Sequence, residues 1–255
     1  MITKNPEEIK ILRDGGRILA AVLNLVASKV APGISAAELD HLAESEIIKA
    51  GGRPSFKNYR SQPSDKPFPA TLCVSRNNEV VHGIPYKDKI LQDGDIVGLD
   101  LGMEYQGLFT DSAITVPVGK VNEKHLRLIQ AAKDCLNAGL NAVMPGNFTG
   151  DVGHAIETMA EKYKLQVVRE LVGHGVGKAV HEEPEVPGFG RPKTGTKILE
   201  GMVLAVEPMV NEGGWKIDFA PDQWTIVTED GGWSAHMEHT ILVTADGFEI
   251  LSSKA

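Results

Sequence analysis

Four acidic residues lie in stretches of the sequence that are otherwise apolar. Asp100 and Asp111 fall within residues 95–116 (DIVGLDLGMEYQGLFTDSAITV), Glu207 falls within MVLAVEPM, and Glu238 falls within MEHTILV. A buried carboxylate without a partner costs several kcal/mol, so such acids are normally paired, neutralised or bound to a cation. We therefore expect these four acids to share one cation site.

Two of the acidic stretches resemble each other. Residues 111–116 (DSAITV) align with residues 238–243 (EHTILV), which places Asp111 opposite Glu238. Because side chains alternate along a strand, Glu238 shares a face with Thr240, whereas His239 points the other way and is expected to be structural or solvent-facing. The similarity indicates that the site is built from two related segments.

A histidine between glycines is the best candidate for a nitrogen ligand. His174 lies in GHGVG (173–177), where the bare backbone suits close approach of a ligand or a tight bend at a strand end. This motif is not the GxGxxG of a phosphate-binding loop. The HEEP that begins at His181 is not HExxH, because residue 185 is Glu and Pro184 would break the helix.

Four carboxylates and an imidazole form a hard-to-borderline ligand set. Such a set suits a site for Co²⁺, Mn²⁺, Fe²⁺ or Zn²⁺ and differs from structural zinc sites, whose ligands are thiolates. Four negative charges exceed what one divalent ion requires, so two ions roughly 3.5 Å apart with shared carboxylates are indicated. The residues alone leave open a dinuclear hydrolase, a set of structural salt bridges and a monovalent-ion site.

The composition is that of an ordinary soluble domain. The chain has 255 residues, of which 42% are hydrophobic and 24% charged, and its net charge of −8 offers no footprint for nucleic acid or an anionic membrane. The polar N-terminal residues contain no signal sequence, and no run approaches the ~18 apolar residues of a membrane helix. Cys73 and Cys135 fit reduced thiols. We expect a cytoplasmic monomer.

Helix signals occur in two pairs. Asn5 and Pro6 begin a first helix, and Ser35 with Glu38 forms a capping box for a second, which Gly51 and Gly52 close. A second pair follows, with apolar stripes over residues 126–143 and 152–163.

Strand patterns follow each helix pair. The predicted strands cover residues 71–81 and 96–116, and then segments from 166 to about 251. Between them, residues 53–69 form a long, proline-rich loop in which Phe56, Tyr59 and Phe68 either line a pocket or pack locally.

This order predicts an α+β fold with a largely antiparallel sheet and two helix pairs. We expect a single catalytic domain, residues 1–255, built of two related halves at about 1–119 and 120–255. If the halves pack about a pseudo-twofold axis, corresponding strands bring the four acids to one centre.

At these residues the chain resembles the type I methionine aminopeptidases, in their short bacterial form, within the pita-bread metallopeptidase superfamily (M24). The stretches that carry the resemblance are EVVHGIP (79–85), GDIVGLDLG (94–102), TDSAITVPVG (110–119), GHGVGKAVHEEP (173–184), GMVLAVEPM (201–209) and SAHMEHTILVT (234–244). They span most of the chain in family order. The resemblance implies the duplicated pita-bread (creatinase/aminopeptidase) fold.

The resemblance also assigns roles to the metal ligands. It implies two divalent metal ions, with Asp100 on the first, Asp111 and Glu238 bridging both, and His174 and Glu207 on the second. It implies that a metal-bridged hydroxide attacks the first peptide carbonyl, with Glu207 as general base. The expected activity is that of a methionyl aminopeptidase, a dinuclear metallo-exopeptidase that removes the initiator methionine from nascent proteins.

Substrate contacts follow from the same resemblance. His82 and His181 match the family's catalytic, substrate-contacting histidines, and Tyr59, Phe68, Cys73 and Trp224 fall near the methionine pocket. Residues 61–67 add length to the loop before this pocket. A transient ribosome contact remains open.

Two rival functions remain. An Xaa-Pro peptidase resembles the same fold, but its members usually carry an N-terminal domain ahead of the catalytic one, whereas here the first predicted helix begins at Asn5. A non-catalytic pita-bread module that binds peptides, ribosomes or nucleic acid would not need a complete ligand set. We therefore favour the aminopeptidase.

Overall fold

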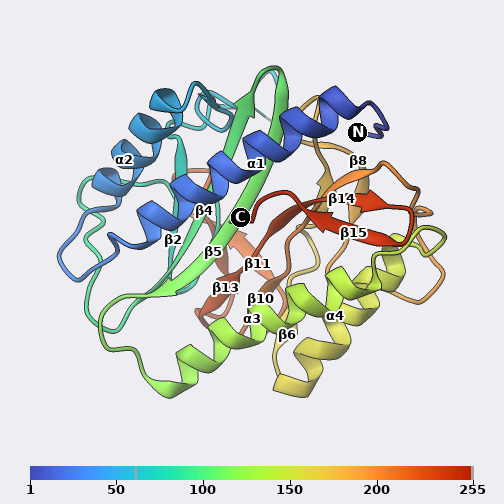
Figure 1. Ribbon diagram of the computed structural model, residues 1–255. Coiled ribbons are helices and arrows are strands. Elements are labelled where there is room, and N and C mark those ends of the chain that lie inside the picture. The colour runs from blue at the N-terminus through green and yellow to red at the C-terminus, as the bar shows by residue number, and fades with distance from the viewer. Residues whose placement is uncertain (61, 254–255) are drawn as a thin grey trace.

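The helices lie against one side of a set of antiparallel sheets. The computed structural model describes residues 1–60 and 62–253, and Figure 1 shows α1, α3 and α4 in front of the strands. The C-terminal segment ends between α1 and α3 in this view. The predicted α+β fold with two helix pairs is confirmed, and every strand pairing in the described residues is antiparallel.

The first helix pair starts at the residues that the sequence indicates. In α1 (Pro6–Ala27), the Asn5 side chain accepts a hydrogen bond from the Glu7 backbone N–H. In α2 (Ala36–Lys49), Ser35 and Glu38 form the predicted capping box. These caps satisfy backbone donors that the first turn of a helix leaves free.

The first pair covers a sheet of four strands. Its order is β1 (Arg53–Pro54), β4 (Ile96–Tyr105) and β2 (Leu72–Arg76), and β5 (Leu108–Pro117) also pairs with β4. Leucine, valine and isoleucine side chains from α1, α2 and these strands form one buried cluster. A second, smaller sheet joins β3 (Glu79–Val81) to β12 (Ile226–Thr228) and β11 (Ile217–Phe219).

The second helix pair, α3 (Glu123–Ala142) and α4 (Thr149–Tyr163), covers the sheets of the second half. One is five-stranded, with the order β15 (Gly247–Ile250), β14 (His239–Thr244), β9 (Val203–Val206), β7 (Gly173–Gly175) and β8 (Glu182–Val186). The other is β13 (Ser234–His236), β10 (Met209–Asn211) and β6 (Gln166–Val167). A separate buried cluster fills the space beneath α3 and α4.

Two threonine hydroxyls tie β5 to β13 and β14. The Thr115 hydroxyl donates to the His236 carbonyl (2.8 Å) and accepts from the His236 N–H (2.9 Å). The Thr240 hydroxyl donates to the Asp111 carbonyl (2.7 Å) and accepts from the Asp111 N–H (2.8 Å). We call these four hydrogen bonds the threonine clamp. In the clamp, Thr115 binds His236 as Thr240 binds Asp111, so Asp111 and His236 occupy equivalent positions. The sequence alignment instead made Asp111 equivalent to Glu238, and it is therefore wrong by two residues.

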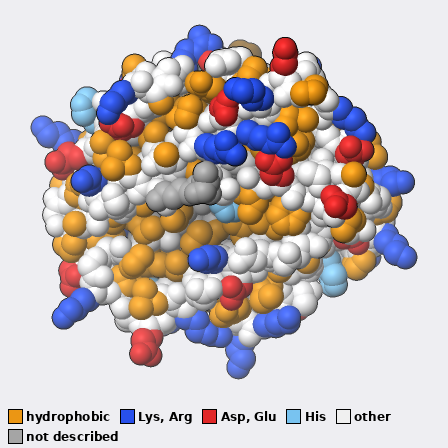
Figure 2. Space-filling model, viewed as in Figure 1, with side chains coloured by type: hydrophobic (Ala, Val, Ile, Leu, Met, Phe, Trp, Pro, Cys, Tyr) orange, Lys and Arg blue, Asp and Glu red, His pale blue; other side chains and the backbone are white. Residues whose placement is uncertain are grey.

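Other features of the chain bear on the site only indirectly. The 53–69 region is largely irregular, as predicted, although Arg53 and Pro54 pair with β4; Ser61, the first residue of the predicted extension, lies outside the described residues. None of the helices in the described part of the chain is long and apolar enough to cross a bilayer. Figure 2 shows positive and negative side chains interspersed on the helical face.

Candidate metal centre

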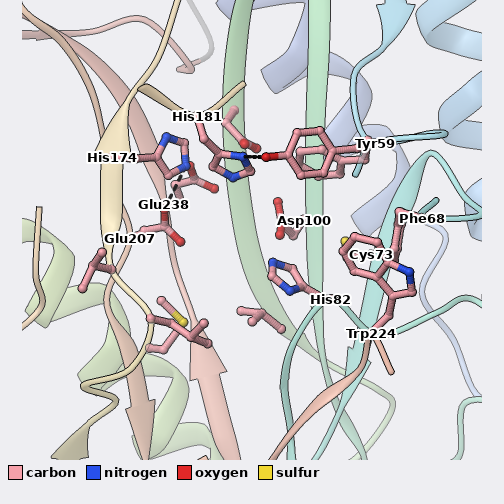
Figure 3. Close-up of a pocket in the computed structure, with 16 residues that line it drawn as sticks. Tyr59, Phe68, Cys73, His82, Asp100, His174, His181, Glu207, Trp224 and Glu238 are labelled. Carbon is pink, nitrogen blue, oxygen red and sulfur yellow. Dashed lines mark hydrogen bonds and ion pairs between the residues drawn. The ribbon is translucent and has the colours of Figure 1, made fainter. Parts of the chain in front are cut away.

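All of the predicted site residues line one cavity of about 280 Å³. Figure 3 shows His174, Glu207 and Glu238 on one side of it and Phe68, Cys73 and Trp224 on the other, with Asp100, His82 and His181 between them. The lining residues predicted from the sequence are Tyr59, Phe68, Cys73, His82, Asp100, Asp111, His174, His181, Glu207, Trp224 and Glu238. A polar wall therefore faces an aromatic one.

Two neighbouring strands bring the first pair of acids together. Asp100 on β4 is paired with Ala113 of β5 and with Cys73 of β2, and Asp111 on β5 is paired with Gly102 of β4. Both carboxylates are buried, and Oδ1 of Asp100 has no hydrogen-bond partner among the described residues.

The second pair of acids lies where two paired strands are interrupted. Strand β9 ends at Val206, opposite His239 of β14, and β10 begins at Met209, opposite His236 of β13. Residues 207–208 and 237–238 are thus left facing each other between the two sheets. Glu207 and Glu238 lie in this break. Glu238 is only 2% exposed, and its Oε1 has no hydrogen-bond partner within the described residues.

His174 is held by close packing of its strand. A Cβ atom on Gly175 would lie 2.2 Å from the Glu183 carbonyl oxygen, so only glycine allows β8 to approach this closely. The glycine after His174 therefore allows a close approach of backbone, whereas the sequence predicted close approach of a ligand or a tight bend at a strand end.

The hydrogen bonds of His174 define what its ring can bind. Nδ1 lies 2.9 Å from the Gly175 carbonyl oxygen, which can only accept, so Nδ1 carries the hydrogen. In the neutral ring Nε2 then presents a lone pair, yet it lies 3.2 Å from Oε1 of Glu207, another lone-pair atom. Such a contact is stable only with a positive charge, a proton or a metal ion, between the two atoms.

The ligand atoms fit a divalent cation. One atom each from Asp111, His174 and Glu238 lie within 4.8 Å of one another. The unpartnered oxygens of Asp100 and Glu238 belong to the same cavity. Buried oxygen and imidazole donors without protein partners are what a metal of the Mn²⁺ to Zn²⁺ series requires.

Burial and mutual repulsion raise the pKa of three of these acids. Burial, followed by the charges of Asp111 and Glu207, raises the pKa of Asp100 well above its usual range. The same causes raise the pKa of Glu238, and burial raises the pKa of Asp111 to about 6. Without a cation, the site retains protons that neutralise its charge.

Glu207 and His174 behave in the opposite way. Burial alone would raise the pKa of Glu207, but the imidazoles of His174 and His236 lower it to about 2. Burial alone would lower the pKa of His174, but Glu207 raises it to about 8. Glu207 therefore stays ionised throughout the physiological pH range.

His82 is placed by a backbone conformation that is uncommon for its residue type. Its φ is +57°, in the left-handed region, and the turn is held by the Gly83 N–H donating to the Ser75 hydroxyl (3.1 Å). Val74 N–H in turn donates to the Gly83 carbonyl at 2.8 Å. Burial lowers the pKa of His82 to about 4, so the ring is neutral at physiological pH.

His181 is paired with a residue of the long loop. Its Nδ1 lies 2.7 Å from the Tyr59 hydroxyl, and its ring makes an edge contact with the ring of His174, 4.4 Å between centroids. Burial, with the nearby His174, lowers the pKa of His181 to about 4. When Tyr59 donates to Nδ1, the remaining nitrogen, Nε2, carries the hydrogen of the neutral ring.

An apolar cluster forms the opposite wall. Phe68 and Cys73 are buried together, and Trp224 packs edge-on against Phe68 with 5.3 Å between ring centroids. The Trp224 indole N–H donates to the Lys66 carbonyl oxygen at 3.1 Å, which ties it to the long loop. Trp224 thus lines the cavity as a half-buried side chain and not as part of a main core.

Some lining residues were not predicted. Leu171, Val172 and Met209 line the cavity, and the first two directly precede the Gly173–Gly175 strand, where an apolar pair next to a candidate ligand was the available signal. The sequence assigns no role to His236, whose buried Nε2 lies 3.5 Å from Oε2 of Glu207. His239, predicted to be structural, bonds the Ser252 hydroxyl.

Comparison with known proteins gives a consistent result. The profile described as Metallopeptidase family M24 matches residues 10–245. The chain is 44% identical over 252 residues to methionine aminopeptidase 1 of Bacillus subtilis, covering 99% of both chains. It is 41% identical over 252 residues to the methionine aminopeptidase of Clostridium acetobutylicum, covering 99% of this chain and 98% of the relative.

Solved structures show the same relationship. A methionine aminopeptidase from Thermotoga maritima superposes with a TM-score of 0.95 at 40% identity, covering all of both chains. A prolidase from Pyrococcus furiosus superposes with a TM-score of 0.77 at 20% identity, where this chain covers 66% of the prolidase. The latter likeness shows a shared fold only.

Proposed function

Because the chain belongs to metallopeptidase family M24, we propose that it is a hydrolase that uses divalent metal ions to remove the N-terminal methionine from peptides and nascent proteins. Its fold is the pita-bread fold of aminopeptidases and prolidases. The observation that carries the proposal is a cavity in which a carboxylate–imidazole wall faces an aromatic, apolar wall. One wall suits an amide being hydrolysed and the other suits a thioether side chain.

The proposed metal ligands are Asp100, Asp111, His174, Glu207 and Glu238. Four carboxylates in one buried site carry more negative charge than a single divalent ion requires, which supports two ions, of Co²⁺, Mn²⁺, Fe²⁺ or Zn²⁺. When bound, such ions supply Lewis acidity to the scissile carbonyl and activate water for attack.

The protein's own groups complete the proposed reaction. Glu207, which is ionised at neutral pH, is assigned as the group that accepts a proton from the attacking water. His181 donates from Nε2 to the carbonyl oxygen as negative charge develops there. His82 sits between the polar and apolar walls and orients the peptide.

The methionine side chain is proposed to enter the apolar wall. Phe68, Cys73 and Trp224 form it, and the loop that carries Tyr59 closes over the same cavity. The two cysteines are free and buried, which supports a reducing, cytoplasmic location. A monomeric enzyme that meets nascent chains at the ribosome is the remaining part of the proposal.

Two peptides assayed side by side test the substrate. With added Mn²⁺ or Co²⁺, Met-Ala-Ser should be cleaved to free methionine, whereas Ala-Pro-Ser should not be cleaved measurably. Preferential cleavage of the proline peptide would replace the proposal with an Xaa-Pro peptidase. Cleavage of neither peptide by metal-loaded, folded protein would exclude both activities and leave a binding module.

A further inference from the structure

His236 is a buried histidine that neither the ligand set nor the substrate contacts use. It is 3% exposed, and its Nε2 has no hydrogen-bond partner within the described residues. Oε2 of Glu207 lies 3.5 Å from this nitrogen. A buried imidazole nitrogen left in this position requires an explanation, because unpaired buried polar atoms are uncommon and costly.

The backbone of His236 is fixed on both sides. Thr115 binds both its N–H and its carbonyl, and His236 lies opposite Met209, two residues after Glu207. In the threonine clamp, His236 in the second half is structurally equivalent to Asp111 in the first half. The side chain is therefore directed into the site by the fold and not by chance rotation.

The two oxygens of Glu207 have different neighbours. Oε1 lies 3.2 Å from Nε2 of His174, the nitrogen that presents a lone pair and so shares a cation with Oε1. Oε2 lies 3.5 Å from Nε2 of the other imidazole, that of His236. A carboxylate oxygen only accepts hydrogen bonds, so the nitrogen that satisfies Oε2 must carry a hydrogen.

His236 is not placed as a further ligand. All five proposed ligands line the cavity, and His236 is not among its lining residues in the described part of the chain. We propose that His236 is a positioning residue, whose Nε2–H donates to Oε2 of Glu207 and so turns Oε1 toward the cation that it shares with His174. Hydrogen bonds from outside the ligand set commonly orient carboxylate ligands in this way.

A pair of amide substitutions tests this role. The glutamine amide nitrogen reaches the position of histidine Nε2, whereas the asparagine nitrogen reaches only that of Nδ1. His236→Gln should therefore bind Mn²⁺ within about threefold of wild type, and His236→Asn should bind it about 10- to 100-fold more weakly, the usual cost of losing such a partner. Affinity is measured by calorimetric titration of the full chain after treatment with a chelator.

Wild-type Mn²⁺ affinity in His236→Asn would overturn the proposal. Equal weakening in both variants would also overturn it, because the imidazole itself, as ligand or packing group, would then be what matters. Urea unfolding of the metal-free variants shows that each is folded. The inference rests on the proposed metal centre but not on its substrate, because the Mn²⁺ titration contains no peptide. If neither peptide is cleaved in the assay above, the titration still tests the role of His236.

Discussion

His174 and Glu207 face each other through lone pairs, and this single contact explains much of the chemistry of the site. A proton or a metal ion must lie between Nε2 and Oε1, and the opposite pKa shifts of the two groups reflect the proton that remains when no metal is bound. The neighbouring acids then hold further protons because burial raises their pKa values. A residue-scale change should therefore affect metal binding and stability in opposite directions.

Replacing Asp111 by asparagine separates these two effects. Asp111→Asn should lower turnover at least about 100-fold, because the carboxylate proposed to bridge both metal ions is replaced by a neutral amide. The metal-free variant should unfold cooperatively and be at least as stable as wild type at pH 7.5, because a buried negative charge is removed. Turnover, metal content and urea unfolding measure the outcome. Near-normal turnover would rule out the bridging role.

His181 should affect catalysis without affecting metal content. His181→Ala should lower kcat about 100- to 1,000-fold, the usual effect of removing one donor to a developing oxyanion. Metal analysis of the purified variant is the control, because loss of metal would make His181 a ligand instead. Tyr59→Phe should lower kcat by only about two- to tenfold, since it removes one hydrogen bond that holds the ring.

At the scale of elements, the metal ligands stand where regular strand pairing stops. The break between β9 and β10 faces the break between β13 and β14, and Glu207 and Glu238 occupy it. Regular pairing there would satisfy the backbone but would turn neighbouring side chains to alternate faces. The threonine clamp holds β5 to the broken strands by hydroxyl hydrogen bonds in place of a regular ladder.

Removing one hydroxyl of the threonine clamp should therefore destabilise the fold. Thr240→Val keeps the shape of the side chain but leaves the N–H and carbonyl of Asp111 unpaired in a buried position, at a cost of about 1–3 kcal/mol. Thr240→Ser, which keeps the hydroxyl, should recover most of this loss. The free energy of unfolding in urea, measured on metal-free protein, gives both values. Equal stability of the valine variant and wild type would contradict a structural role for the clamp.

At the scale of the whole molecule, stability and metal binding are linked through protons. Between about pH 6.5 and pH 8 the acids of the unfolded chain are already ionised, and its His174 loses the rest of its protonation. In the folded, metal-free protein the pKa of His174 is raised from 6.5 to about 8, and the pKa values of Asp100 and Glu238 are raised strongly. Through these groups the folded state binds more protons, so their contribution to the free energy of unfolding falls as the pH rises through this window.

Metal removal should make this dependence visible. His82 and His181, with pKa values of about 4, are neutral in the folded state, and they oppose this fall only by the protons that the unfolded chain still loses above pH 6.5. In the presence of a chelator, the raised pKa of His174 alone should lower the free energy of unfolding by about 1 kcal/mol from pH 6.5 to 8. With Mn²⁺ the ion replaces the protons, so the stability gap between the two samples should widen as pH rises. A stability gap that is the same at both pH values would show that the site does not retain protons.

The nature of the ligands and the local structure followed from the sequence. Carboxylates in apolar strands and a glycine-flanked histidine indicate a cation site because buried charge needs a partner, and this holds whatever the tertiary contacts. The helix starts at Asn5 and Ser35 were also predictable, since capping depends on residues a few positions apart. The aromatic loop residues were predicted as pocket lining but could not be distinguished from local packing.

Only the tertiary structure decided the register between the halves. Side chains repeat every two residues along a strand, so a shift of two residues preserves every face, and the sequence pattern cannot tell Asp111 opposite Glu238 from Asp111 related to His236. The threonine clamp settles the register and brings His236 to Glu207. The same holds for Tyr59 and His181, which are 122 residues apart and meet because a loop of one half closes over a strand of the other. The local sequence thus identified the candidate metal ligands, and long-range packing decided which side chains are in contact.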